Sequence, residues 1–241
     1  MDYMKHIQIL LELWSSGFCM IAGICLLLSP KEKNKSAIFL IILEFICAIY
    51  MVTDAFAWIY DGTDFIYSNI IVHCSNFMLY LSDYLLVIFM GSYIASKIQE
   101  GGYKGKCKWK YIIYGLNGLC ILLLIISQFN GLFYHISESN AYSRGSWYIL
   151  SQMLPVAAIL IAVAGMFLQR NYVTVITRIA ISTFVLLPAV AIVYQTFHYG
   201  YAYTGLATAL SFLLVFAGYE IDIDRFHSAA NTEKENTRGE E

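Results

Sequence analysis

Apolar residues dominate seven stretches of this chain, and short polar gaps separate them. Each stretch is close to or above the roughly 20 residues that a helix needs to cross a hydrocarbon core about 30 Å thick. The expected helices cover residues 7–28, 37–60, 65–96, 111–133, 147–168, 179–199 and 204–221. The pattern predicts an all-α, polytopic membrane protein that folds as a seven-transmembrane-helix bundle.

Basic residues predict how this bundle is oriented. Of the 15 Lys and Arg residues, all except Lys5 and Arg144 fall in alternate gaps or after the last helix. Short cytoplasmic loops retain Lys and Arg, so the gaps rich in these residues are expected inside the cell. We therefore expect the N-terminus outside, the C-terminus in the cytoplasm, and a multi-pass position in the plasma membrane.

Composition supports a single membrane domain. Hydrophobic residues make up 59% of the chain and charged residues 13%, and the mean hydropathy is +0.62, which is too apolar for a soluble protein of this length. Residues 1–226 are expected to form the membrane domain, and the polar residues 227–241 a disordered cytoplasmic tail. All six cysteines are expected to be free thiols, and nothing in the charge pattern supports nucleic-acid binding.

Two polar stripes run along neighbouring helices. Asn69, His73, Asn76, Tyr80 and Asp83 follow one another at spacings of four, three, four and three, so they share one face of the third helix. The second helix carries Glu44, Asp54 and Trp58 in a similar stripe. Ionisable groups at membrane depth cost at least about 2.5 kcal/mol, so they are expected to face the bundle interior.

These stripes predict a ligand site, although a simpler interpretation is also open. The expected site residues come from the two stripes and from two later helices: Asp54, Trp58, Asn69, His73, Asn76, Asp83, Gln152 and Gln195. They would line a polar cavity that opens to the outside and binds an unknown small ligand. The alternative is that these side chains only hydrogen-bond one helix to another.

Several functional classes lack their motifs in this sequence. It contains no His-Glu-x-x-His zinc pattern, no Gly-x-Ser-x-Gly nucleophile turn and no phosphate-binding loop, so we expect neither an enzyme nor a bound metal or cofactor. Retinal proteins hold their pigment on a lysine of the last helix, and residues 204–221 contain no lysine. A light-driven pump is therefore excluded.

Three short segments resemble a known family. Residues 54–62 (DAFAWIYDG), the pair Ser68-Asn69 and the segment Tyr142-x-Arg-Gly145 are similar to the N-terminal seven-helix sensor region of certain bacterial sensor histidine kinases and related diguanylate cyclases. The resemblance implies a membrane sensor that relays a signal inward. Neither a kinase nor a cyclase domain occurs in these 241 residues, so the expected partner is a separate histidine kinase or another cytoplasmic signalling protein.

A different class of function fits the same residues. Glu44, Asp54 and Asp83 are the groups that a small-solute or proton-coupled transporter would use. The sequence leaves the sensor and the transporter open, and it leaves a homodimer open as well.

Overall fold

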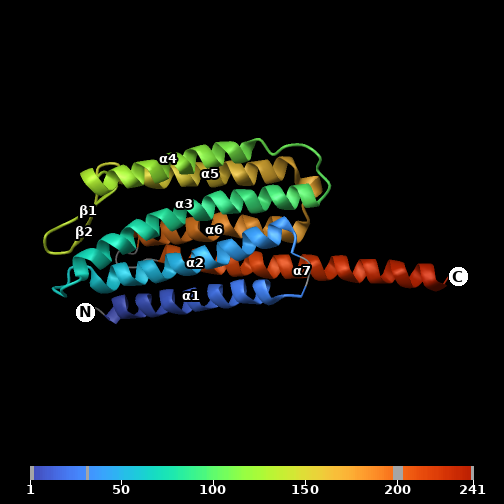
Figure 1. The fold of residues 1–241 in the computed structure, drawn as a ribbon, viewed down its shortest axis with the longest axis horizontal. Helices are drawn as coiled ribbons and strands as arrows, with labels where there is room; N and C mark the ends of the chain where they lie inside the picture. Colours follow the sequence, from blue (N-terminus) through green and yellow to red (C-terminus); the bar gives the residue numbers. More distant parts are fainter. Residues whose placement is uncertain (1–2, 31–32, 198–202, 240–241) are drawn as a thin grey trace.

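The computed structural model describes residues 3–30, 33–197 and 203–239. Seven helices run side by side in this part of the chain (Figure 1). They are α1 (Tyr3–Leu28), α2 (Lys35–Tyr60), α3 (Ser68–Glu100), α4 (Trp109–Asn130), α5 (Tyr148–Leu168), α6 (Val175–Phe197) and α7 (Tyr203–Gly239). The predicted all-α bundle is confirmed, and most helix ends fall within a few residues of the expected ones.

The helices are suited to a lipid bilayer. Six of those described, all except α6, are long and apolar enough to cross a membrane. The apolar part of α6 found among the described residues is shorter, Val175–Ala191. Large apolar side chains such as Trp14, Ile70 and Leu186 are exposed, as expected where lipid covers the surface. The protein is therefore a multi-pass membrane protein.

The two ends of the bundle differ, and we name them by their contents. At the basic end, α1, α3 and α5 finish, α2, α4 and α6 begin, and α7 leaves the bundle (Figure 1). At the hairpin end, a two-stranded antiparallel sheet joins α4 to α5. Its strands are β1 (Tyr134–Ile136) and β2 (Tyr142–Arg144), with His135 opposite Ser143.

The sequence pattern missed this hairpin and placed residues 131–133 in a helix. Gly131 adopts a left-handed conformation, with φ of 67°, which ends α4 after Asn130. The next residues alternate, because Tyr134 and Ile136 are buried and His135 is exposed. Apolar residues on both sides of Gly131 hid this change from helix to strand.

The C-terminal part of the chain also differs from the expectation. Residues 227–239 continue α7 as helix, where the sequence predicts a disordered tail. In Figure 1 this part extends past the rest of the bundle. Continuing a formed helix needs no new nucleus, and the Ala, Glu and Lys residues of this segment favour helix.

Each helix packs on a neighbour through a shared apolar core. Close pairs include α1 with α2, α2 with α3, α4 with α5, and α6 with α7. The larger of two buried clusters includes Leu43, Met90 and Phe212. The smaller one gathers Tyr80, Leu124 and other residues beneath the hairpin. The bundle therefore has a long central core with a separate aromatic cap at one end.

Candidate functional site

A pair of carboxyl groups lies where α1, α2 and α7 meet. Asp54 of α2 interacts with Glu12 of α1 and with Trp58, which lies one turn further along α2. Glu12 is only 1% exposed, and one of its oxygens accepts a 3.0 Å hydrogen bond from Nε2 of Gln8. Its other oxygen has no hydrogen-bond partner. A Cβ atom added to Gly205 of α7 would lie 3.7 Å from Oδ2 of Asp54, so α7 passes close to this pair.

A third carboxyl group approaches the same region from α3. Tyr50 of α2 interacts electrostatically with both Asp54 and Asp83. Asp83 also interacts with Tyr84 of its own helix and with Cys120 of α4. The acid-bearing stripes of α2 and α3 thus meet around Tyr50. Of the predicted site residues, the structure brings Asp54, Trp58 and Asp83 into one region, to which Glu12 adds a group that was not among them.

Glu44 forms a separate buried acid between α1 and α2. It is fully buried, and neither of its carboxyl oxygens has a hydrogen-bond partner. Among the described side chains, no Lys or Arg forms an ion pair with Glu12, Glu44, Asp54 or Asp83. Such unpaired acids are rare at membrane depth and generally mark functional positions.

The remaining predicted residues lie apart from these acids or bond locally. Asn69 is exposed, and buried Asn76 donates a 2.8 Å hydrogen bond to the carbonyl oxygen of Val72 in its own helix. The backbone oxygen of His73 accepts a 3.4 Å hydrogen bond from the Tyr134 hydroxyl. Asn76 therefore bonds within its own helix, and His73 contacts the hairpin through its backbone oxygen and not through its imidazole.

Two predicted residues come from later helices. Gln152 is exposed on α5 and donates a 3.2 Å hydrogen bond to its neighbour Ser151. The side chain of Gln195 lies outside the described part of the structure. Among the described residues, no hydrogen bond joins Gln152 to Asp54.

The hairpin is fixed to the α2–α3 connection. The backbone N–H of Tyr142 donates a 2.8 Å hydrogen bond to Asp61. Nδ2 of Asn140 donates one of 2.9 Å to the carbonyl oxygen of Thr63, and the N–H of Gly62 donates one of 3.1 Å to the carbonyl oxygen of Asn140. These bonds close the hairpin end over α2 and α3.

Aromatic rings continue this closure inward. The ring of Tyr80 stacks on that of Tyr134, with centroids 5.5 Å apart and planes 12° apart. The hydroxyls of Tyr80 and Tyr142 lie 3.1 Å apart. Burial raises the pKa of Tyr134 to about 12, so its phenol stays neutral at physiological pH. These rings are therefore held by stacking and by a hydrogen bond between neutral phenols, in addition to the Asp61 bond.

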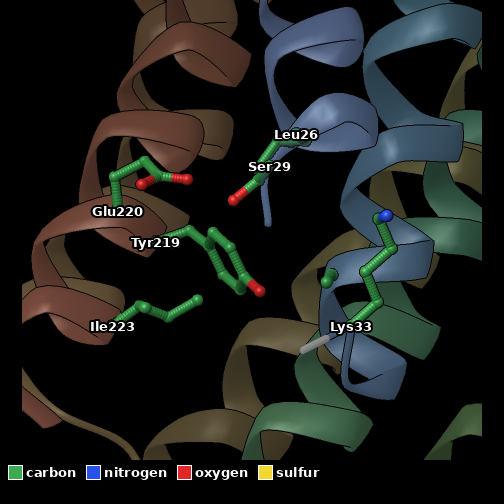
Figure 2. Close-up of a pocket in the computed structure, with 7 residues that line it drawn as sticks. Leu26, Ser29, Lys33, Tyr219, Glu220 and Ile223 are labelled. Atoms are coloured by element: carbon green, nitrogen blue, oxygen red, sulfur yellow. The ribbon is translucent and has the colours of Figure 1, made fainter. Parts of the chain in front are cut away.

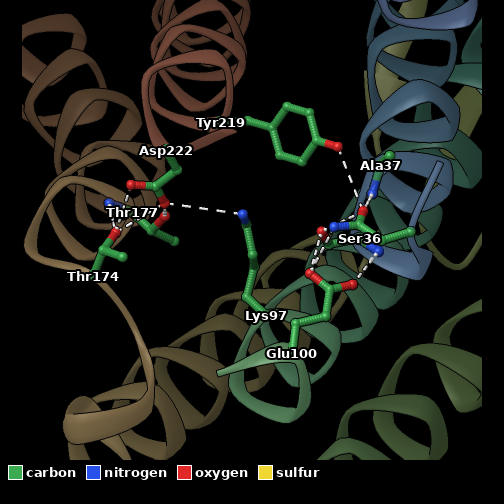
Figure 3. Close-up of polar contacts among 9 residues, drawn as sticks. Ser36, Ala37, Lys97, Glu100, Thr174, Thr177, Tyr219 and Asp222 are labelled. Carbon is green, nitrogen blue, oxygen red and sulfur yellow. Dashed lines mark hydrogen bonds and ion pairs between the residues drawn. The ribbon is translucent and has the colours of Figure 1, made fainter. Parts of the chain in front are cut away.

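A charged network occupies the basic end (Figure 3). Asp222 of α7 is 3% exposed and accepts hydrogen bonds from the hydroxyls of Thr174 and Thr177 at the start of α6, the former at 2.8 and 2.9 Å. Nζ of Lys97, from α3, lies 3.9 Å from Asp222 and 4.7 Å from the ring centroid of Tyr219. Asp222 thus ties α7 to both α6 and α3.

A second carboxylate joins α3 to the start of α2. Glu100 accepts hydrogen bonds from the backbone N–H and the hydroxyl of Ser36, at 3.0 and 2.7 Å, and from Nδ2 of Asn34 at 3.1 Å. Oδ1 of Asn34 caps α2 by accepting from the N–H of Ala37 at 2.8 Å. Tyr219 of α7 donates a 3.4 Å bond to the same oxygen. The network therefore connects four helices.

A small recess lies beside this network, between the end of α1, the start of α2 and α7 (Figure 2). It is lined by Leu26, Ser29, Lys33, Ala37, Tyr219, Glu220 and Ile223. Neither the network nor the recess was predicted as a site from the sequence pattern. The available signal was Asp222, which lies between Glu220 and Asp224 where the apolar part of α7 ends, and which shares a helix face with Tyr219 three residues earlier.

Comparisons with protein-family models, with curated proteins and with solved structures found no match to this chain. The resemblance to sensor histidine kinases and diguanylate cyclases thus stays a prediction from residues 54–62, 68–69 and 142–145. The structure places parts of two of these segments in contact, through the bond between Asp61 and Tyr142.

Proposed function

We propose that this protein is a seven-span sensor of the bacterial plasma membrane. In this proposal it detects a signal from outside or from the bilayer, and α7 relays the signal to a cytoplasmic partner such as a histidine kinase. One observation carries the proposal: α7 is a single helix that passes the Asp54 pair, is anchored through Asp222, and continues beyond the bundle.

The length of α7 suits this role. The helix has 37 residues, so at about 1.5 Å per residue it extends for roughly 55 Å. Gly205 lies near its first turn and Asp222 about five turns later. A continuous helix transmits a shift or rotation along its axis, so a change at Asp54 would reach the segment that leaves the bundle.

The distribution of charge supports a cytoplasmic output. The basic end holds the loops that carry Lys104, Lys106, Lys108 and Arg170, and α7 leaves the bundle there. Positive loops remain inside the cell. In this orientation α6 provides a seventh span, and the hairpin faces the outside.

The proposed input is binding at the junction of α1, α2 and α7. A ligand or partner shifts the equilibrium between two bundle conformations only if it binds them with different free energies. The proposed contacts of the ligand are Glu12, Asp54 and Trp58. A ligand that contacts Asp54 would change the surroundings of Gly205 on α7. The Asp222 network supplies polar contacts that two conformations would exchange.

A fusion protein tests the relay. A histidine kinase domain is joined after Phe226, and one to four alanines are inserted at the junction to rotate it by about 100° each. We expect kinase activity to depend on this rotation. We also expect Asp54→Asn to change the kinase activity while the amount of protein stays the same. Asp64→Asn, which alters an exposed acid, serves as the control. If all the alanine insertions gave equal kinase activity and Asp54→Asn had no effect, the proposed sensor function would be excluded.

A transporter is the second candidate, and the acids that lack a basic partner favour it. Glu44, Asp54 and Asp83 lie in spans without a described basic partner, as groups that bind and release a proton or a cation do. Purified protein in liposomes would then take up a solute or protons, and amide substitutions at these acids would stop uptake. Absence of any flux, together with phase-dependent fusions, would favour the sensor.

A further inference from the structure

Two cysteines face each other between α1 and α2. The Sγ atoms of Cys19 and Cys47 lie 3.7 Å apart, and both residues are fully buried. On the same seam, the hydroxyl of Ser16 donates a 3.0 Å hydrogen bond to the carbonyl oxygen of Ala48. Small residues let the two helix backbones approach closely here, so this seam holds the two thiols in direct contact.

Glu44 lies at the same position on the seam. It is three residues before Cys47, so the two share a face of α2. A Cβ atom added to Gly23 of α1 would lie 3.3 Å from the Cβ of Glu44, which shows how closely α1 passes this side chain. The carboxyl group interacts with the Cys19 thiol, and neither of its oxygens has a hydrogen-bond partner. Burying a carboxyl group without a hydrogen-bond partner costs free energy. Proton exchange with the Cys19 thiol is a function that would explain why Glu44 lies here.

We propose that Cys19 and Cys47 form an oxidisable dithiol that hydrogen peroxide converts into a disulfide between α1 and α2, with Glu44 as the base. The reaction involves only side chains of α1 and α2 and needs no movement of α7. It therefore goes beyond the proposed sensor and does not depend on it.

The chemistry takes place in two balanced steps. The ionised form of Glu44 takes the proton of the Cys19 thiol, and the thiolate attacks one peroxide oxygen and breaks the O–O bond. Cys19 becomes a sulfenic acid, and the hydroxide released takes the proton back from Glu44 to give water. The Cys47 sulfur then attacks the Cys19 sulfur, and the sulfenic hydroxyl leaves with the Cys47 proton as a second water. Two thiols and one peroxide thus give one disulfide and two waters.

Peroxide suits the geometry better than a bulky oxidant does. Neither sulfur has exposed surface, so the oxidant has to enter a close-packed seam between two helices. Hydrogen peroxide is close to water in size and is uncharged, which lets it reach such a position. Cys25 and Cys74 are exposed, and no hydrogen bond links either to another described thiol, so they are not the pair that we propose.

The test uses the 241-residue chain, purified in detergent, with Cys25 and Cys74 replaced by serine. After treatment with hydrogen peroxide, free thiols are blocked with a maleimide, disulfides are reduced, and the new thiols are tagged with a large maleimide and counted on a gel. We expect two protected thiols per chain, and none in Cys19→Ser or Cys47→Ser. Glu44→Gln should slow the reaction on the order of a hundredfold, the usual contribution of a general base.

Glu138→Gln provides the matched control, because it makes the same acid-to-amide change at an exposed site in the hairpin; its rate should be unchanged. Mass spectrometry of the peroxide-treated chain with both cysteines present should find the linked Cys19–Cys47 peptide, which keeps the test valid if a serine variant fails to fold. Absence of that peptide overturns the proposed disulfide. An unchanged rate in Glu44→Gln overturns the role of Glu44.

Discussion

The hairpin end and the basic end close the same bundle by different chemistry. At the hairpin end, stacked tyrosines and uncharged or backbone hydrogen bonds hold β1 and β2 against α3, as the Tyr80–Tyr134 pair shows. At the basic end, Asp222 of α7 accepts hydrogen bonds from the start of α6, Glu100 of α3 accepts them from the start of α2, and Lys97 lies beside Asp222. The first closure depends on ring contact, whereas the second depends on buried charge.

This difference assigns different roles to the two ends. Each aromatic contact or neutral hydrogen bond contributes about 1 kcal/mol, so the loss of one contact lowers the stability of the hairpin end by a small amount and leaves the other contacts in place. A buried charge is costly once its partner leaves, so the contacts of Asp222 break or form together. The aromatic contacts of the hairpin end are suited to keep it closed. The charged contacts of the basic end are suited to switch between two arrangements.

The largest expected effect concerns the sides of the membrane that the two ends face. In a cysteine-free variant, Ser139→Cys in the hairpin loop should react with an impermeant thiol reagent on intact cells, and Lys106→Cys at the basic end should not. Both positions are exposed, whereas the native Cys107 is fully buried and would make a poor reporter. Labelling of Lys106→Cys alone would reverse the orientation.

The next effect tests the charged closure. Asp222→Ala removes the acceptor of Thr174 and Thr177 and leaves Lys97, only 11% exposed in its side chain, without its carboxylate. We expect the free energy of unfolding in mixed micelles to fall by about 3–5 kcal/mol. Asp222→Asn, which keeps one acceptor oxygen, should lose less. Joint replacement of Asp222 and Lys97 by leucine should recover part of the loss, and failure of all three to differ from the native chain would contradict the network.

The apolar pattern of the sequence predicted the helices because each span has to be apolar over a fixed length. It missed the hairpin, since β1 and β2 are only three residues long and β1 follows α4 after a single glycine turn. The helix beyond residue 226 also differs from the expectation, because a polar segment can continue a helix that is already formed.

Prediction of the site was less complete, for a physical reason. Spacing along one helix shows which residues share a face, and it places Asp54, Trp58 and Asp83 on the polar faces of α2 and α3. It does not show which residue of another helix lies opposite. Glu12, Gly205 and Asp222 act through contacts between helices distant in sequence, and only the packed bundle defines these contacts.

A pair of glycines shows what the two ends share. A Cβ atom on Gly101, at the basic end, would lie 1.9 Å from the carbonyl oxygen of Tyr172, and one on Gly145, beside the hairpin, 2.2 Å from that of Leu132. Backbone has to move to admit either. Alanine at each position should lower the free energy of unfolding by about 1–3 kcal/mol.

Gly118 is the control for this pair, because a Cβ atom there would meet nothing within 4 Å. Gly118→Ala should leave stability unchanged or raise it by up to about 1 kcal/mol. If Gly101→Ala behaved like Gly118→Ala while Gly145→Ala did not, close backbone packing would belong to the hairpin end alone.

The smallest effect tests the aromatic closure. Tyr80→Phe removes the hydroxyl that lies 3.1 Å from that of Tyr142 and keeps the stacked ring. We expect a loss of about 1 kcal/mol, seen as roughly fivefold faster hydrogen exchange at the hairpin amides. Tyr84→Phe is the matched control, since the Tyr84 hydroxyl is buried without a hydrogen-bond partner and its removal should cost nothing. Because the two closures share no residue, Asp222→Asn should leave hairpin exchange unchanged, and faster exchange in that variant would show that the two ends are coupled.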